Sequence, residues 1–149
     1  MKTIIKNFMG AGLIFTLLTL FSFSGPNGGD SYRVYFNDKL MLEQFVHMDK
    51  SVRNLELPAR SENGQVDVYY SHCGKVGKNR YLTIQDENRR PIHVWEYPDA
   101  VDGAGAMNFT VKQVMPLLKN KEDKFFLSYS SRELPKGITI ASFSLENYK

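Results

Sequence analysis

The stretch RYLTIQDENRRPIHVWEY, residues 80–97, has the form of a β-hairpin. Its two halves are rich in β-branched and aromatic residues and flank the polar segment DENRR, which is typical of a turn. A three-residue loop at 87–89 places all the aliphatic side chains of both strands on one face. This register gives the pairs Ile84–Ile92, Leu82–Val94, Arg80–Glu96, Tyr81–Trp95 and Thr83–His93. Because burying aliphatic side chains stabilises more than one aromatic pair does, we expect the aliphatic face to form the core.

The rest of the chain after residue 30 follows the same pattern. Short apolar and aromatic runs alternate with turn residues. We expect an all-β fold, an antiparallel two-sheet sandwich of about eight strands. The expected strands are 32–36, 40–46, 51–57, 66–72, 80–86, 91–97, 125–131 and 138–145, with a short piece at 106–109.

A second hairpin is expected in YRVYFNDKLMLEQFV, residues 32–46. A three-residue loop at 37–39 fits better than a two-residue loop, because it brings apolar residues opposite one another and opposes unlike charges. Such a loop needs a left-handed residue, which we expect at Asp38 or Lys39. The expected pairs are Phe36–Leu40, Val34–Leu42 and Arg33–Glu43.

One helical signal interrupts the strands, in TVKQVMPLLKN from residue 110. Thr110 and Gln113 have the spacing of a capping box, in which each end of the first turn caps the other. Pro116 disfavours helical geometry at Met115 and clashes with the preceding turn. We therefore expect one short helical turn near 110–115.

The N-terminal segment reads as a signal peptide. Lys2 and Lys6 precede an uncharged apolar run over 8–23, and small residues around Ser24 suit cleavage there. A membrane anchor is the alternative, but the run is shorter than the ~20 residues that span a bilayer. We expect residues 1–24 to be cleaved, 25–30 to form a Gly-rich linker and 31–149 to form one domain, exported to the periplasm or secreted.

The charge balance changes when the signal is removed. The chain has 19 Lys and Arg and 16 Asp and Glu, a net charge of +3. The signal takes two Lys and no acid, which leaves 17 against 16, a net charge of +1. This balance gives no basic surface for nucleic acid, and an exported chain rarely meets any. We expect no nucleic-acid partner and no membrane contact after cleavage.

The segment YYSHCGKVGKNR, residues 69–80, holds the only cysteine. Its glycine spacing does not match a phosphate-binding loop, and a lone thiol has no partner within the chain. Crowding by cations would make the thiol reactive, whereas the commoner role is a small buried apolar residue near a strand end. Neighbouring side chains of a strand point to opposite faces, so His72 is poorly placed to activate Cys73. The candidate reactive loop comprises His72, Cys73, Lys75 and Lys78.

Other chemistry has little support in the sequence. The three histidines and one cysteine show none of the short spacings of zinc sites, and Asp99 to Gly103 lacks the alternating acids of a calcium loop. No pair of carboxylates stands out for glycoside hydrolysis. We expect no metal, no cofactor and no catalytic residue.

Aromatic residues on the 80–97 hairpin give the strongest functional signal. In the expected register they share one face, where flat rings could stack on sugars or anchor a protein. The alternative is that this face is packed inside the molecule. The candidate binding residues are Tyr81, His93, Trp95 and Tyr97.

Three stretches, VYYSHCG, RYLTIQDENRRPIHVWEY and FFLSYSSRELPKG, together resemble a family of small exported bacterial proteins with no activity attached. The resemblance covers most of residues 31–149 and implies export and a compact β domain. It supplies no site.

Three functions remain open from the sequence. The first is a secreted or periplasmic binding or interaction module that takes a glycan or a protein. The second is a small exported enzyme or redox-responsive protein centred on Cys73. The third is a structural subunit that pairs through an edge strand.

We expect the exported protein to begin near Gly25 and to carry no lipid, since no cysteine lies near the junction. Intact mass spectrometry of exported material checks this. Retention of Met1, or an added acyl mass, would contradict it.

Overall fold

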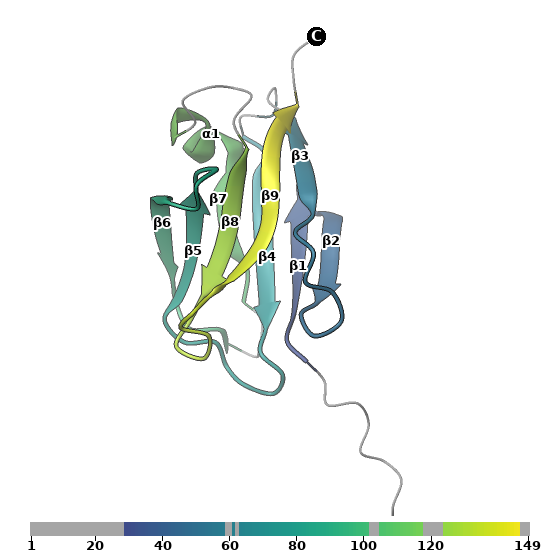
Figure 1. Ribbon diagram of the computed structural model, residues 1–149, viewed down its shortest axis with the longest axis vertical. Coiled ribbons are helices and arrows are strands. Elements are labelled where there is room, and N and C mark those ends of the chain that lie inside the picture. Colours follow the sequence, from purple (N-terminus) through teal and green to yellow (C-terminus); the bar gives the residue numbers. More distant parts are fainter. Residues whose placement is uncertain (1–28, 59–60, 62, 102–104, 118–123, 147–149) are drawn as a thin grey trace, which may run out of the picture.

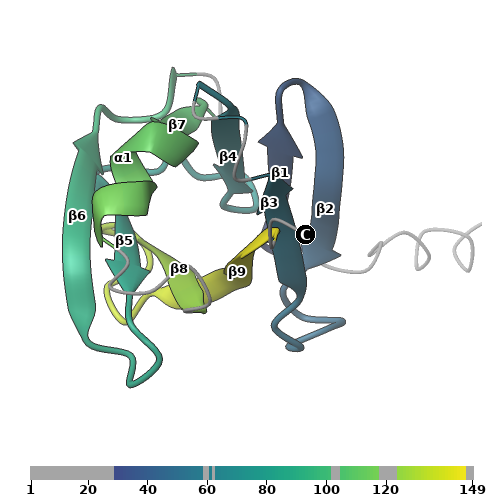
Figure 2. The same ribbon diagram turned by 90° about the horizontal axis from the view of Figure 1, so that it is seen from above.

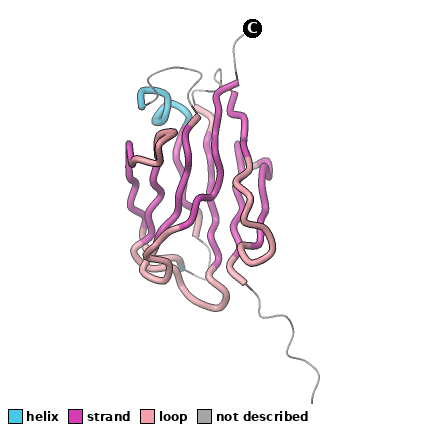
Figure 3. The backbone as a smooth tube through the Cα atoms, in the orientation of Figure 1, coloured by secondary structure: helices cyan, strands magenta, loops and turns pink. Residues whose placement is uncertain are grey.

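The computed structural model describes residues 29–58, 61, 63–101, 105–117 and 124–146. The expected signal peptide and most of the linker lie outside these residues. Strands dominate the described chain (Figures 1 and 3). They are β1 (Ser31–Phe36), β2 (Lys39–Phe45), β3 (Asn54–Pro58), β4 (Gln65–Ser71), β5 (Arg80–Gln85), β6 (Pro91–Tyr97), β7 (Met107–Thr110), β8 (Phe125–Ser130) and β9 (Ile138–Glu146).

The described strands form two sheets that face each other across one core (Figure 2). The four-stranded sheet has the order β2-β1-β4-β7, and the five-stranded sheet has the order β3-β9-β8-β5-β6. Every described pair is antiparallel except β3 with β9, which is parallel. The expected all-β two-sheet sandwich is confirmed, and each expected strand lies within a few residues of an observed one.

Alternation along each central strand places the core. In β4, Val66, Val68 and Tyr70 are buried, and in β8, Leu127 and Tyr129 are buried. A fully buried aliphatic or aromatic side chain contributes about 1.5–3 kcal/mol relative to an exposed one, so this alternation fixes which face of each strand points inward.

One helical turn covers an end of the core (Figure 1). The helix α1 (Val111–Val114) continues as a 3₁₀ turn, η2 (Met115–Leu117). The Gln113 side chain reaches back, and its Oε1 accepts the Thr110 backbone N–H at 2.7 Å. The side chains of Val111 and Val114, both in this helix, are buried. The expected short helical turn is confirmed, and it ends in the 3₁₀ turn that contains the expected breaker, Pro116.

The β1–β2 hairpin is partly as expected. Val34 pairs with Leu42 and Arg33 with Glu43, but the three-residue loop was wrong. Asn37 and Asp38, with φ of 45° and 63°, form a two-residue turn, so Phe36 pairs with Lys39. An Asn-Asp pair tolerates the two left-handed residues of such a turn. A bulge in the hairpin then restores the expected pairing further along.

The expected β5–β6 register was wrong for a different reason, a bulge beyond a correctly predicted loop. The loop at 87–89 is present, since Asp86 N–H donates to Arg90 O at 2.9 Å. Beyond it the register shifts by one residue, so Leu82 pairs with Trp95 and Ile84 with His93. In β5 the inner face is as expected. The aliphatic residues of β6 point outward instead, with Ile92 39% and Val94 51% exposed.

Trp95 therefore turns toward the core and not away from it. Its ring stacks on Phe109 of the opposite sheet, with centroids 5.0 Å apart and an interplanar angle of 8°. Tyr97 also packs against the core, and its hydroxyl donates to Asn108 O at 2.6 Å. These contacts close the side of the sandwich between β6 and β7.

The tight turn before β9 provides a test of the fold. Gly137 has φ of 66°, and a Cβ there would lie 2.9 Å from Tyr129 O, whereas Gly74 has φ of 71° and nothing within 4 Å. We expect Gly74→Ala to cost about 1–2 kcal/mol for the left-handed backbone alone. Gly137→Ala should cost at least about 1 kcal/mol more, because of the clash. Urea unfolding of both variants measures the difference, and equal costs would contradict it.

Candidate functional site

The four candidate aromatic and histidine residues do not share one face. Tyr81 lies on the outer face of β5, between the buried Leu82 and the strand end. Trp95 and Tyr97 pack inward, and the exposed His93 ring contacts Trp95 edge-on with centroids 4.6 Å apart. Burial raises the pKa of Tyr97 to about 12, although Arg80 opposes the shift. These three residues build the side of the sandwich and form no open row with Tyr81.

The candidate reactive loop is divided as the strand geometry predicts. His72 is 4% exposed and points inward, while Cys73 is exposed on a turn. Lys75 and Lys78 are also exposed. The sequence left the burial of Cys73 open, and the commoner role of a buried thiol does not apply, because β4 ends at Ser71 and the chain turns outward at Gly74.

His72 belongs to a buried polar cluster at the end of the core. Its Nδ1 lies 3.3 Å from Asp30 Oδ2, and its Nε2 lies 2.9 Å from the Tyr129 hydroxyl and 3.1 Å from Ser131 Oγ. An Nδ1–H donor to Asp30 leaves Nε2 as the acceptor for these hydroxyls. Burial is the main cause that raises the pKa of Tyr129, so the phenol stays protonated and can donate.

Asp30, His72 and Ser131 resemble a Ser-His-Asp arrangement in composition. Ser131 is only 5% exposed, and its Oγ accepts the Leu134 N–H at 3.2 Å. A buried hydroxyl that is already engaged cannot meet a substrate carbonyl. The cluster therefore ties three segments together and is structural.

Arg80 is a second buried polar group that the sequence did not reveal. It is 2% exposed. We expected it to pair with Glu96, but in the structure it lies opposite Tyr97. Its Nε donates to Pro98 O at 2.7 Å and its Nη1 to Gly105 O at 2.6 Å. The guanidinium thus anchors the loop after β6.

An open hollow of about 360 Å³ lies on the outer face of the four-stranded sheet. We call it the tyrosine hollow. It arises because β1 and β4 pair with Arg33 opposite Tyr69 and Tyr35 opposite Asp67, all on the face away from the core. Its lining residues are Arg33, Tyr35, Asp38, Asp67 and Tyr69.

Several side chains that line the tyrosine hollow contact one another. The Tyr35 and Tyr69 rings meet edge-to-face with centroids 5.5 Å apart, and Arg33 Cζ lies 5.8 Å from the Tyr69 centroid. Asp67 is only 8% exposed, and its Oδ1 accepts Gln65 Nε2–H at 2.7 Å. The hollow thus combines a largely buried carboxylate with two aromatic rings and a guanidinium.

Sequence reasoning missed the tyrosine hollow. Alternation within β4 already puts Asp67 and Tyr69 opposite the apolar residues of that strand, which was an available signal. The pairing of β1 with β4, which joins residues 30 to 40 positions apart, has no local signal.

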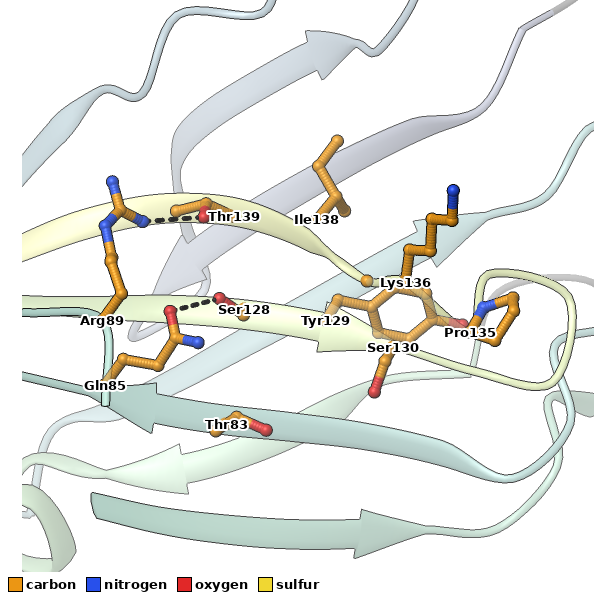
Figure 4. Close-up of a pocket in the computed structure, with 11 residues that line it drawn as sticks. Thr83, Gln85, Arg89, Ser128, Tyr129, Ser130, Pro135, Lys136, Ile138 and Thr139 are labelled. Carbon is orange, nitrogen blue, oxygen red and sulfur yellow. Dashed lines mark hydrogen bonds between the residues drawn. The ribbon is translucent and has the colours of Figure 1, made fainter. Parts of the chain in front are cut away.

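A second hollow of about 370 Å³ lies on the outer face of the five-stranded sheet (Figure 4). We call it the hydroxyl groove. It runs over β5, β8 and β9 and is bounded by the turn that carries Arg89 and the turn before β9. Among its lining residues are Thr83, Gln85, Arg89, Ser128, Lys136 and Thr139.

In the described part of the chain, no group of three or more His, Cys, Asp or Glu is placed to hold a metal ion. Among the same residues, no helix has the length and apolar character needed to cross a membrane.

No protein-family model matches the chain, and no curated protein matches it. Candidate functions therefore follow from the residues of the two hollows.

The neighbours His72 and Cys73 give a matched test of the buried cluster. We expect His72→Ala to lower the free energy of unfolding by about 2–4 kcal/mol, through the cavity and the lost hydrogen bonds. Cys73→Ser should change it by less than about 0.5 kcal/mol, since the thiol is exposed. Urea unfolding measures both. Similar losses in the two variants would show that the thiol is not solvent-exposed in solution.

Proposed function

We propose that this protein is an exported binding module, secreted or periplasmic, that holds a saccharide in the tyrosine hollow. The observation that carries the proposal is Asp67, a carboxylate more than nine-tenths buried that lines the same open hollow as two tyrosine rings. Export is supported by the signal-like residues 1–24 and by the family resemblance.

The chemistry of the hollow suits a sugar ring. Sugar hydroxyls can donate to the carboxylates of Asp67 and Asp38 and accept from the Arg33 guanidinium. The C–H face of a sugar can pack on a tyrosine ring, which offers large area at low entropic cost. A small cation is a poorer fit, because Arg33 already lies over the Tyr69 ring.

The two other functions have weaker support. An enzyme centred on Cys73 cannot use the neighbouring His72 as its base, since His72 faces inward and is engaged. Pairing through β6 would use an exposed strand with Ile92 and Val94 outward. That strand begins at Pro91 and pairs through a bulge, two features that discourage edge pairing.

A glycan-array screen followed by calorimetric titration tests the proposal. We expect Tyr69→Ala and Asp67→Asn each to weaken saccharide binding about tenfold, or about 1.4 kcal/mol, through lost stacking and a lost charge-assisted hydrogen bond. Tyr81→Ala removes an outward tyrosine from the other sheet and should leave binding unchanged.

Circular dichroism of each variant confirms that it is folded. Binding that survives both substitutions in the hollow, or the absence of any bound glycan, would refute the proposal. Release of free sugar during the titration would indicate a hydrolase in which Asp38 and Asp67 act together.

A further inference from the structure

The hydroxyl groove has an unbalanced charge. Arg89 and Lys136 line it, and no carboxylate does. Figure 4 shows the two cations toward opposite ends, with hydroxyl side chains of β5, β8 and β9 between them. Two arginines elsewhere in the described chain do pair with acids, Arg53 with Asp49 and Arg90 with Asp86.

Arg89 is held in place without an acidic partner. It occupies a left-handed position in the β5–β6 turn, with φ of 63°, and its N–H donates to Asp86 O at 2.9 Å. Its Cζ lies 3.5 Å from the centroid of the Phe126 ring, and its Nη1 donates to Thr139 Oγ1 at 2.8 Å. Within the described residues it makes no ion pair, whereas its neighbour Arg90 does.

A guanidinium held in this way is preorganised to bind an anion. Stacking on an aromatic ring and a hydrogen bond to a strand hold its plane, so little side-chain freedom remains to be lost on binding. Its remaining N–H groups form the fork that matches a carboxylate.

The floor of the groove supplies partners for hydroxyl groups. Ser128 Oγ–H donates to Gln85 Oε1 at 2.9 Å, which leaves the Gln85 amide N–H groups as donors. Thr83 and Thr139 also line the groove, and each hydroxyl can donate or accept. A ligand with several hydroxyls and an acid group would satisfy both the floor and the cations.

We propose that the hydroxyl groove is a second binding site, which takes a carboxylate-bearing saccharide of the uronic-acid type. Arg89 binds the carboxylate, the strand side chains bind the ring hydroxyls, and Lys136 attracts a further acid group. The two hollows lie on the outer faces of different sheets, so this site does not depend on the function proposed for the tyrosine hollow.

NMR titration of the ¹⁵N-labelled protein tests this site with trigalacturonate, a neutral trisaccharide of the same length and inorganic sulfate. We expect trigalacturonate to shift the amide signals of 83–85, 128–130 and 136–139, and added salt to weaken its binding. Arg89→Gln should weaken it about tenfold, and Arg89→Lys should recover only part, since the ammonium lacks the fork.

Matched variants separate this site from the rest of the surface. Lys136→Gln should also weaken binding, while Lys50→Gln, the same charge change at an exposed loop position, should not. Tyr69→Ala should have no effect, and a loss there would instead place the ligand in the tyrosine hollow and overturn the inference.

Three further results would overturn it. They are equal binding of the neutral trisaccharide, no shift with trigalacturonate, and sulfate that shifts the same signals as strongly as trigalacturonate does, which would mean a free-anion site only.

Discussion

The stacking of Tyr70 on Tyr129 joins the two sheets, and the positions of both hollows follow from it. The rings belong to β4 and β8, with centroids 4.2 Å apart and an interplanar angle of 18°. His72 and Asp30 complete this contact through hydrogen bonds to the two phenols. Because side chains of a strand alternate, an inward Tyr70 requires an outward Tyr69, and an inward Tyr129 requires an outward Ser128. One buried contact thus orients functional groups on both faces of the molecule.

The two outer faces carry different chemistry on the same architecture. On β1 and β4 the outward residues are aromatic, acidic and basic, whereas on β5, β8 and β9 most are hydroxyls. These outward side chains contribute little to the packing of the core. The fold therefore does not require them to be apolar, and residue types suited to recognition can occupy these positions. Binding residues usually lie on loops, but here both hollows are built largely on strands, which hold side chains more rigidly. Turns contribute Asp38 to the tyrosine hollow and Arg89 and Lys136 to the ends of the hydroxyl groove.

Local patterns in the sequence predicted the fold class, the strands and the helical turn, because each depends on residues close together in the chain. In the β5–β6 hairpin the register failed where a bulge inserted one residue, since parity arguments assume an uninterrupted ladder. The extra residue reverses which side chains of β6 point inward, and this places the Trp95 ring on Phe109. The energetic comparison of aliphatic with aromatic faces omitted this partner, which lies in the opposite sheet. A stacked indole buries more area than Val94 would, so the aromatic side faces inward.

The predicted binding residues were misplaced for the same reason, because parity along a strand does not detect a bulge. Placing Tyr81 with Trp95 needed the wrong register, and their separation is a direct consequence of the bulge. The tyrosine hollow needed the pairing of β1 with β4, and the hydroxyl groove needed β8 between β5 and β9, neither of which is local. The sequence of each strand nevertheless indicated which residues face outward, since Asp67 lies between Val66 and Val68 and Ser128 lies between Leu127 and Tyr129. A polar residue at every second position of an otherwise apolar strand predicts an open outer face. Which outer faces meet, and hence what they bind, is decided by the order of the strands.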